Sequence, residues 1–203
     1  MKIHTVEHAR KSPGSCSTCG KPIEVGDPYK WGQNFRASKV VKCGTCQFRN
    51  SDMTQSKLAG FYAAQEQAED AIEAWDPANG KDSLESDLSS AADDAEAVAE
   101  EYREAVSGWE HETSTTAEWE EKAEAIDEWC TNVREALDSV EDFDLDAKRI
   151  EAIGEVLDID AENYEALTAE QQAEVDEWID TAIDEWADEV REAATDVVSE
   201  FSL

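Results

Sequence analysis

Residues 16–46 have the sequence CSTCGKPIEVGDPYKWGQNFRASKVVKCGTC, which contains four of the five cysteines in a chain of 203 residues. The four form two Cys-x-x-Cys pairs, Cys16 with Cys19 and Cys43 with Cys46. Each pair can form a tight turn that directs two sulfur atoms at one metal ion, and Gly20 suits the left-handed residue of such a turn. Four thiolates complete a tetrahedral zinc site with no coordination position left for water. We therefore predict a structural Zn²⁺ site whose ligands are Cys16, Cys19, Cys43 and Cys46.

The same cysteines allow three other chemistries. Two disulfides would use all four, but the N-terminal residues lack the apolar stretch of an export signal to an oxidising compartment. A redox Cys-x-x-Cys needs only one pair, beside a βαβ pattern that is not visible in this sequence. Iron also binds four thiolates, so an iron–sulfur site stays open as an alternative to zinc. A closed zinc site leaves no position for a substrate, which favours a non-enzymatic protein.

The residues between the two cysteine pairs predict a short β-hairpin. Gly-Asp-Pro at 26–28 is a turn signal. Tyr29, Trp31 and Phe35 mark the first strand, and residues 38–42 form the returning strand, which ends on the second cysteine pair. This places the metal at one end of the hairpin. So short a segment has few aliphatic side chains to bury, so we expect it to fold only with its metal.

Charge divides the chain into two parts. Residues 1–60 hold ten of the 17 lysines and arginines against four acidic residues, a net charge of +6. Residues 61–203 hold the other seven basic residues and 46 of the 50 acidic residues, a net charge of −39. Because four of the five cysteines also lie in the basic part, we expect a zinc-finger module over residues 1–60 and an acidic module over residues 61–203.

The acidic excess indicates the conditions in which the protein works. The acidic residues alternate with a regular apolar pattern, so the segment can fold, although repulsion between so many carboxylates opposes folding in ordinary salt. At about 1 M salt the Debye length is only about 3 Å, and the repulsion is largely screened. The composition therefore favours a haloarchaeal protein. The alternative is an acidic mimic of DNA that inhibits a host nucleic-acid enzyme in a low-salt organism.

Apolar residues recur at intervals of three and four throughout the acidic part, which predicts helices. We expect them over about residues 52–76, 83–109, 116–141, 146–158 and 168–201. Three of these helices begin with a capping-box pattern, at residues 82–85, 115–118 and 168–171. The acidic module is therefore predicted to be all-α.

Two of the expected helices carry a heptad seam, over residues 84–109 and 119–140. Seams of this length, joined by a short turn, predict long antiparallel helices in a bundle or coiled coil. Cys130 lies within the second seam, which favours a small buried side chain rather than a nucleophile. Trp129 lies one position off this seam, where it would border a partner surface.

A patch of basic and aromatic residues on the hairpin predicts what the first module binds. The residues that we expect to contact nucleic acid are Lys30, Trp31, Arg36, Lys39 and Lys42. Basic side chains contact phosphates, and aromatic rings stack on unpaired bases. Two alternatives stay open. The aromatic rings pack over the zinc site as a miniature core, or the basic module docks on an acidic protein surface, such as its own helices.

Several residues of the N-terminal part resemble a known family. They are Cys-x-x-Cys-Gly at 16–20, Ile23, Gly26, Tyr29, Trp31, the second cysteine pair, and Ser-Asp-Met-Thr-Gln-Ser at 51–56. Over about residues 1–75 this pattern resembles small zinc-finger proteins of tailed viruses of bacteria and archaea, whose finger is distantly similar to the PARP-type zinc finger. The resemblance implies that the same four cysteines bind the metal. PARP-type fingers use three cysteines and a histidine, so their recognition of DNA breaks is not carried over to this chain.

Together, these features predict a non-enzymatic zinc-finger adaptor of a haloarchaeal virus or provirus. Its finger would contact nucleic acid, and its helices would bind a protein partner or self-associate. No apolar run is long enough to span a membrane, so we expect the protein in the host cytoplasm, free or associated with the virion. The alternatives are a virion structural or assembly component built on the helices, and the DNA mimic.

Overall fold

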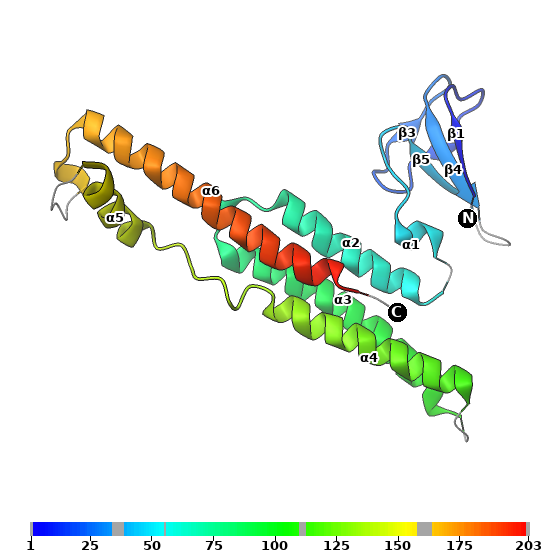
Figure 1. Ribbon diagram of the computed structural model, residues 1–203. Coiled ribbons are helices and arrows are strands. Elements are labelled where there is room, and N and C mark those ends of the chain that lie inside the picture. Colours follow the sequence, from blue (N-terminus) through cyan, green and yellow to red (C-terminus); the bar gives the residue numbers. More distant parts are fainter. Residues whose placement is uncertain (1, 34–38, 55, 110–112, 158–163, 202–203) are drawn as a thin grey trace.

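The computed structural model describes residues 2–33, 39–54, 56–109, 113–157 and 164–201. A small β module at the N-terminus is followed by a larger part made of helices, as Figure 1 shows. This arrangement confirms the predicted fold class, a β-hairpin module followed by an all-α region of long helices. Within the described ranges, no helix is long and apolar enough to cross a membrane.

The β module consists of two small antiparallel sheets. The first has the strand order β1 (Lys2–Val6), β4 (Tyr29–Gln33) and β5 (Val40–Cys43), and the second pairs β2 (Gly14–Ser15) with β3 (Pro22–Ile23). The predicted hairpin corresponds to β4 and β5, whose register places Trp31 opposite Val41. On the other edge of β4, strand β1 places His4 opposite the same tryptophan. Phe35, expected in the first hairpin strand, lies outside the described residues.

The helical part is built from α1 (Asn50–Met53), α2 (Leu58–Ala74), α3 (Lys81–Ser107), α4 (Ser114–Glu135), α5 (Leu145–Leu157) and α6 (Ala169–Ser199). Two short 3₁₀ helices, η1 (Pro77–Asn79) and η2 (Tyr164–Ala166), lie in the connections. Helices α2, α3, α4 and the C-terminal half of α6 pack around one core. Helix α5 packs against the N-terminal half of α6 around a second, smaller core. The predicted antiparallel bundle is therefore formed by three whole helices and half of a fourth.

Small side chains let α3 and α4 pack closely in the bundle. Helix α3 buries two leucines near its start and then a run of alanines, Ala91, Ala92, Ala95 and Ala99. The thiol of Cys130 on α4 donates a hydrogen bond to the carbonyl oxygen of Ala92 (3.2 Å). Burial raises the pKa of Cys130 to about 11, so this side chain is a neutral part of the core, as predicted.

The expected helix over residues 52–76 is divided in the structure into α1 and α2. Thr54 has an extended backbone (φ −94°, ψ 136°), which a helix cannot contain, and α1 ends there. Thr54, a β-branched residue that favours extended backbone, thus separates α1 from α2. Helix α1 lies against α2, and the ion pair of Asp52 with Lys42 joins it to β5.

The helix expected to reach residue 141 ends instead at Glu135. Residues 136–140 continue as turns with hydrogen bonds between residues three apart. The Nζ of Lys81 donates to the carbonyl oxygens of Leu137 (3.3 Å) and Val140 (2.6 Å), which satisfies acceptors that a helix end leaves free. A lysine at the start of α3 therefore caps the carbonyl groups that follow α4.

The three expected capping boxes have different outcomes. The box at Thr168 is present, since its hydroxyl accepts a hydrogen bond from the backbone N–H of Gln171 (3.3 Å). The capping box of α4 begins at Thr113 and not at Thr115, as was predicted. Both residues offer the same hydroxyl as a cap, so the sequence pattern did not distinguish between them. Helix α3 has Gly80 as its N-cap, without a capping side chain.

Candidate metal centre

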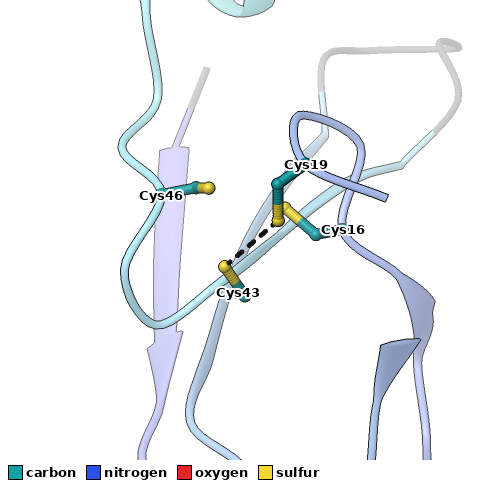
Figure 2. A group of neighbouring side chains, drawn as sticks. All are labelled: Cys16, Cys19, Cys43 and Cys46. Carbon is teal, nitrogen blue, oxygen red and sulfur yellow. Dashed lines mark hydrogen bonds between the residues drawn. The ribbon is translucent and has the colours of Figure 1, made fainter. Parts of the chain in front are cut away.

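The four cysteines of the two Cys-x-x-Cys pairs converge at one end of the β module. Their Sγ atoms all lie within 4.8 Å of one another, and those of Cys19 and Cys43 are 3.9 Å apart. Figure 2 shows the sulfur atoms of Cys16, Cys19 and Cys43 close together, with that of Cys46 directed toward them from the segment after β5. None of the five cysteines is in a disulfide. The structure therefore places the four predicted ligands in one cluster, which can hold a metal ion such as zinc.

The first cysteine pair lies in a turn directly after β2. The backbone N–H of Gly20 donates to the carbonyl oxygen of Cys16 (3.0 Å), and Gly20 has a φ of 69°. This is the left-handed conformation predicted for the turn, and glycine adopts it without steric cost. The backbone N–H and hydroxyl of Ser17 both donate to the carbonyl oxygen of Val41 (2.8 and 2.9 Å). These bonds hold the first turn against β5, which ends at Cys43, the first cysteine of the second pair.

Buried side chains below the cluster form the small core of the module. Cys16, Ile23 and Cys43 are buried, and Tyr29, Val41 and Cys46 pack against them. A Cβ added at Gly44 would lie 2.9 Å from the ring Cγ of Pro28, so the second cysteine turn packs tightly against the hairpin turn. Two of the three buried residues are metal-ligand candidates, so this core has little apolar volume of its own.

The thiols of the cluster have unequal proton affinities. A hydrogen bond with the Thr45 hydroxyl (3.1 Å), followed by the backbone N–H of Cys46, lowers the pKa of Cys43 to about 5. Burial opposes ionisation of Cys16, but hydrogen bonds from backbone N–H groups, chiefly that of Cys19, leave its pKa below the usual range. The neighbouring Cys43 sulfur, then burial, raises the pKa of Cys46 to about 12. Cys43 and Cys16 are thus easier to ionise than a free cysteine, and thiolate is the form that binds metal.

Two of the predicted nucleic-acid contacts have internal partners. The Lys42 side chain is 4% exposed, and its ammonium forms an ion pair with Asp52 of α1. The Nζ of Lys30 donates to the carbonyl oxygen of Cys46 (3.3 Å) and to the side-chain oxygen of Gln47 (2.8 Å). Lys30 therefore holds the chain around Cys46, and Lys42 joins β5 to α1.

The other predicted contacts lie on the opposite face of the sheet or outside the described residues. Trp31 is partly exposed, and its ring stacks on that of His4 with centroids 4.3 Å apart and an angle of 15°. The Nζ of Lys39 lies 4.2 Å from the Trp31 ring centroid. Arg36 is among the residues that the structure does not describe. The stack with His4 was not foreseen, because it depends on the pairing of β1 with β4.

Polar contacts through α1 join the β module to the helices. The guanidinium of Arg49 forms an ion pair with Asp70 of α2, and this hydrogen bond lowers the pKa of the Asp70 carboxyl. The backbone N–H and hydroxyl of Ser51 donate to the two carboxylate oxygens of Glu66 (3.0 and 2.6 Å). The carboxylate of Asp52 accepts from the backbone N–H of Arg49 (2.9 Å) as well as from Lys42. Polar contacts therefore link the end of the β module to α1, and α1 to α2.

Replacing Lys42 by Met should lower the free energy of unfolding of the β module by about 2 kcal/mol, because Asp52 is left without its cationic partner in a mostly buried position. Amide hydrogen exchange of β5 measures this change. The matched control is Lys21→Met, an exposed lysine in the same module, for which we expect less than about 0.5 kcal/mol. Equal effects of the two replacements would show that the buried ion pair has no structural role.

Comparison with known proteins adds no relative. No protein-family model matches the chain, and no curated protein or solved structure is significantly similar to it. The candidate metal centre is therefore defined by its own geometry: two Cys-x-x-Cys turns and four sulfur atoms that meet at one point.

Proposed function

We propose that the protein is a non-enzymatic adaptor in which the cysteine cluster holds one Zn²⁺ and the β module is the recognition element. The observation that carries this proposal is the convergence of four sulfur atoms within 4.8 Å. Zinc with four sulfur ligands at about 2.3 Å requires sulfur atoms about 3.8 Å apart, so small shifts would close the site. Protein atoms would then fill all four positions, and the metal would serve folding and not catalysis.

We further propose single-stranded nucleic acid as the target of this module. The face of the sheet that carries His4 and Trp31 supports it, because two stacked rings with a lysine above them offer both a stacking surface and a positive charge. An incoming base would take the place of the Lys39 ammonium over Trp31, which frees that ammonium for a phosphate. Lys2 lies two residues before His4 on β1, so its side chain is on the same face.

The acidic helices are proposed as the scaffold of the adaptor, for binding a protein partner or for self-association. The net charge of −39 over residues 61–203 supports a protein that works in molar salt, as in haloarchaea. The resemblance to tailed-virus zinc fingers supports a viral or proviral origin. In molar salt, phosphate contacts contribute little affinity, so stacking on Trp31 would carry most of the binding.

Fluorescence anisotropy with labelled single-stranded DNA and RNA tests the proposal, on zinc-loaded protein at low salt and at about 1 M salt. We expect Trp31→Ala to weaken binding at least about tenfold at both salt concentrations, since one stacked base contributes about 1–3 kcal/mol. Lys39→Glu should weaken binding mainly at low salt. The charge-matched control is Lys148→Glu on α5, which lies at the far end of the molecule from the β module.

Two results would contradict the nucleic-acid target. One is the absence of binding to either polymer at both salt concentrations. The other is a loss of affinity that is the same for Trp31→Ala, Lys39→Glu and the α5 control, because binding would then not involve this face of the sheet.

A further inference from the structure

The two cysteine turns of the metal centre are closed in different ways. In the first turn, the backbone N–H of Cys16 donates to the carbonyl oxygen of Lys21 (2.8 Å), and that of Gly20 donates to the carbonyl oxygen of Cys16 (3.0 Å). In the second turn, no backbone–backbone hydrogen bond involves residues 44–48 within the described ranges. Cys43 ends β5, but Cys46 lies three residues beyond this strand, in a segment without regular structure (Figure 2). Side chains must therefore hold the chain that leads away from the fourth ligand.

The segment after Cys46 is anchored at both of its ends. On the side of the sheet, the Nζ of Lys30 on β4 donates to the carbonyl oxygen of Cys46 (3.3 Å) and to the side-chain oxygen of Gln47 (2.8 Å). Three residues after Cys46, both terminal nitrogens of the Arg49 guanidinium donate to the two carboxylate oxygens of Asp70 on α2. A guanidinium that contacts a carboxylate through two nitrogens fixes the direction of the contact as well as its distance. The fourth ligand thus lies close to one anchor in the β module and one in the bundle.

A second contact with α2 reinforces the anchor in the bundle. The backbone N–H and the hydroxyl of Ser51 donate to the two carboxylate oxygens of Glu66, at 3.0 and 2.6 Å, and both residues are half-buried. Glu66 lies four residues before Asp70, so the two carboxylates share one face of α2. Because salt screens partly buried contacts much less than exposed charges, this anchor persists at about 1 M salt.

We infer that Glu66 and Asp70 are positioning residues of the metal centre, which hold Cys46 where its sulfur completes the site. The inference rests on the proposed zinc site and is independent of nucleic-acid binding. Fixing the far end of the segment after Cys46 reduces the conformational entropy that this ligand loses when it binds the metal. Residues that support a ligand from outside the site raise metal affinity in this way. By linkage, zinc in turn strengthens the contact of the β module with the bundle.

Competition with a chromophoric chelator measures the zinc affinity of the full chain at about 1 M salt. Replacing both carboxylates, Glu66→Ala with Asp70→Ala, should weaken zinc binding at least about tenfold, the usual size of such an effect.

The matched control is Glu69→Ala with Glu73→Ala, which removes the same charge from the same helix. Both control residues are exposed, and neither forms a hydrogen bond or an ion pair with α1 in the part of the chain that the structure describes. Glu69 acts on Arg49 through its charge alone, so the control separates direct contact from charge. The control should keep the zinc affinity within about twofold of the wild type.

Two further measurements separate the positioning of Cys46 from a general stabilisation of the β module. In the Cys46→Ala background, the metal has three cysteine ligands, and Glu66→Ala with Asp70→Ala should not lower the zinc affinity further. In the zinc-loaded variant with all four cysteines, amide hydrogen exchange should become faster over residues 47–54 and stay unchanged in β4 and β5. Circular dichroism of every variant checks that the helices are intact.

Three results would overturn the inference. The first is a Glu66→Ala and Asp70→Ala variant that binds zinc as tightly as the wild type, and the second is an equal loss of affinity in the control. The third is the pattern of a general stabilisation, in which the loss is the same with and without Cys46 and exchange in the strands also becomes faster. A wild type that binds no zinc would contradict the metal centre itself, whereas these three results leave it intact.

Discussion

Replacement of Cys43 by Ser should unfold the β module and leave the helices folded. Cys43 is 8% exposed, ends β5, and has the thiol whose pKa is lowered to about 5. Structural zinc contributes about 10 kcal/mol or more to the folding of small modules, and the few buried side chains around Ile23 cannot replace that amount. Amide hydrogen exchange should show protection lost over residues 2–53, whereas the helical circular dichroism signal is retained.

Cys130→Ser is the matched control for this prediction. Cys130 is also buried, but it lies in the bundle, and a serine hydroxyl can keep the hydrogen bond to the carbonyl oxygen of Ala92. This variant should keep the zinc and the protection of the β module. Chelation of the metal from the wild type should reproduce the effect of Cys43→Ser. A β module that stays protected after both treatments would mean that the metal does not hold it together.

Phe61→Ala should lower the free energy of unfolding of the helical bundle by about 4 kcal/mol, because it leaves a cavity in a fully buried position. The Phe61 ring contacts Trp129 of α4 and Phe201 after α6, with centroids 5.1 and 3.9 Å away. One side chain of α2 thus joins two other parts of the bundle. Urea unfolding followed by circular dichroism at about 1 M salt measures the change.

Tyr62→Ala tests whether the position of Phe61, and not the loss of any aromatic ring, is responsible. Tyr62 is the neighbouring residue on α2 and is only half-buried, so we expect less than about 2 kcal/mol. Equal losses of unfolding free energy for the two replacements would contradict the packing of α6 on α2 and α4 at this end of the bundle.

The cysteine cluster was predictable because its information is local. A Cys-x-x-Cys pair defines its own turn, and Gly20 supplies the left-handed residue that this turn needs. The strands β4 and β5 follow from an alternating pattern between two turn signals. By contrast, β1, β2 and β3 were not predicted. Two of these strands have only two residues, and β1 pairs with a partner that lies more than twenty residues away.

The contacts of Lys30 and Lys42 show that a charge pattern in the sequence does not identify the partners of a basic side chain. Both are basic residues beside aromatic ones, as is typical of nucleic-acid contacts. Their ammonium groups are used by Cys46 and Asp52, which come near only once the second cysteine turn and α1 have formed. A sequence pattern gives the charge of a side chain but not the acceptors that folding places around it.

The sequence predicted which neighbouring helices pack together in the bundle, but not how α6 packs on the others. Heptad seams predict α3 against α4, but Trp129 was expected at a partner surface and is 3% exposed. Its indole N–H donates to the carbonyl oxygen of Val198 (3.2 Å), because the C-terminal half of α6 returns across α4. The apolar face of α6 is continuous in the sequence, so nothing in it indicates that Val175 and Ile179 pack on α5 instead.

The central claim is that the four cysteines together hold one zinc ion, and zinc X-ray absorption of the purified protein, with metal content from mass spectrometry, tests it most directly. The account predicts one zinc per chain with four sulfur neighbours at about 2.3 Å. A spectrum with fewer than four sulfur neighbours, or a protein purified with iron in place of zinc, would contradict it.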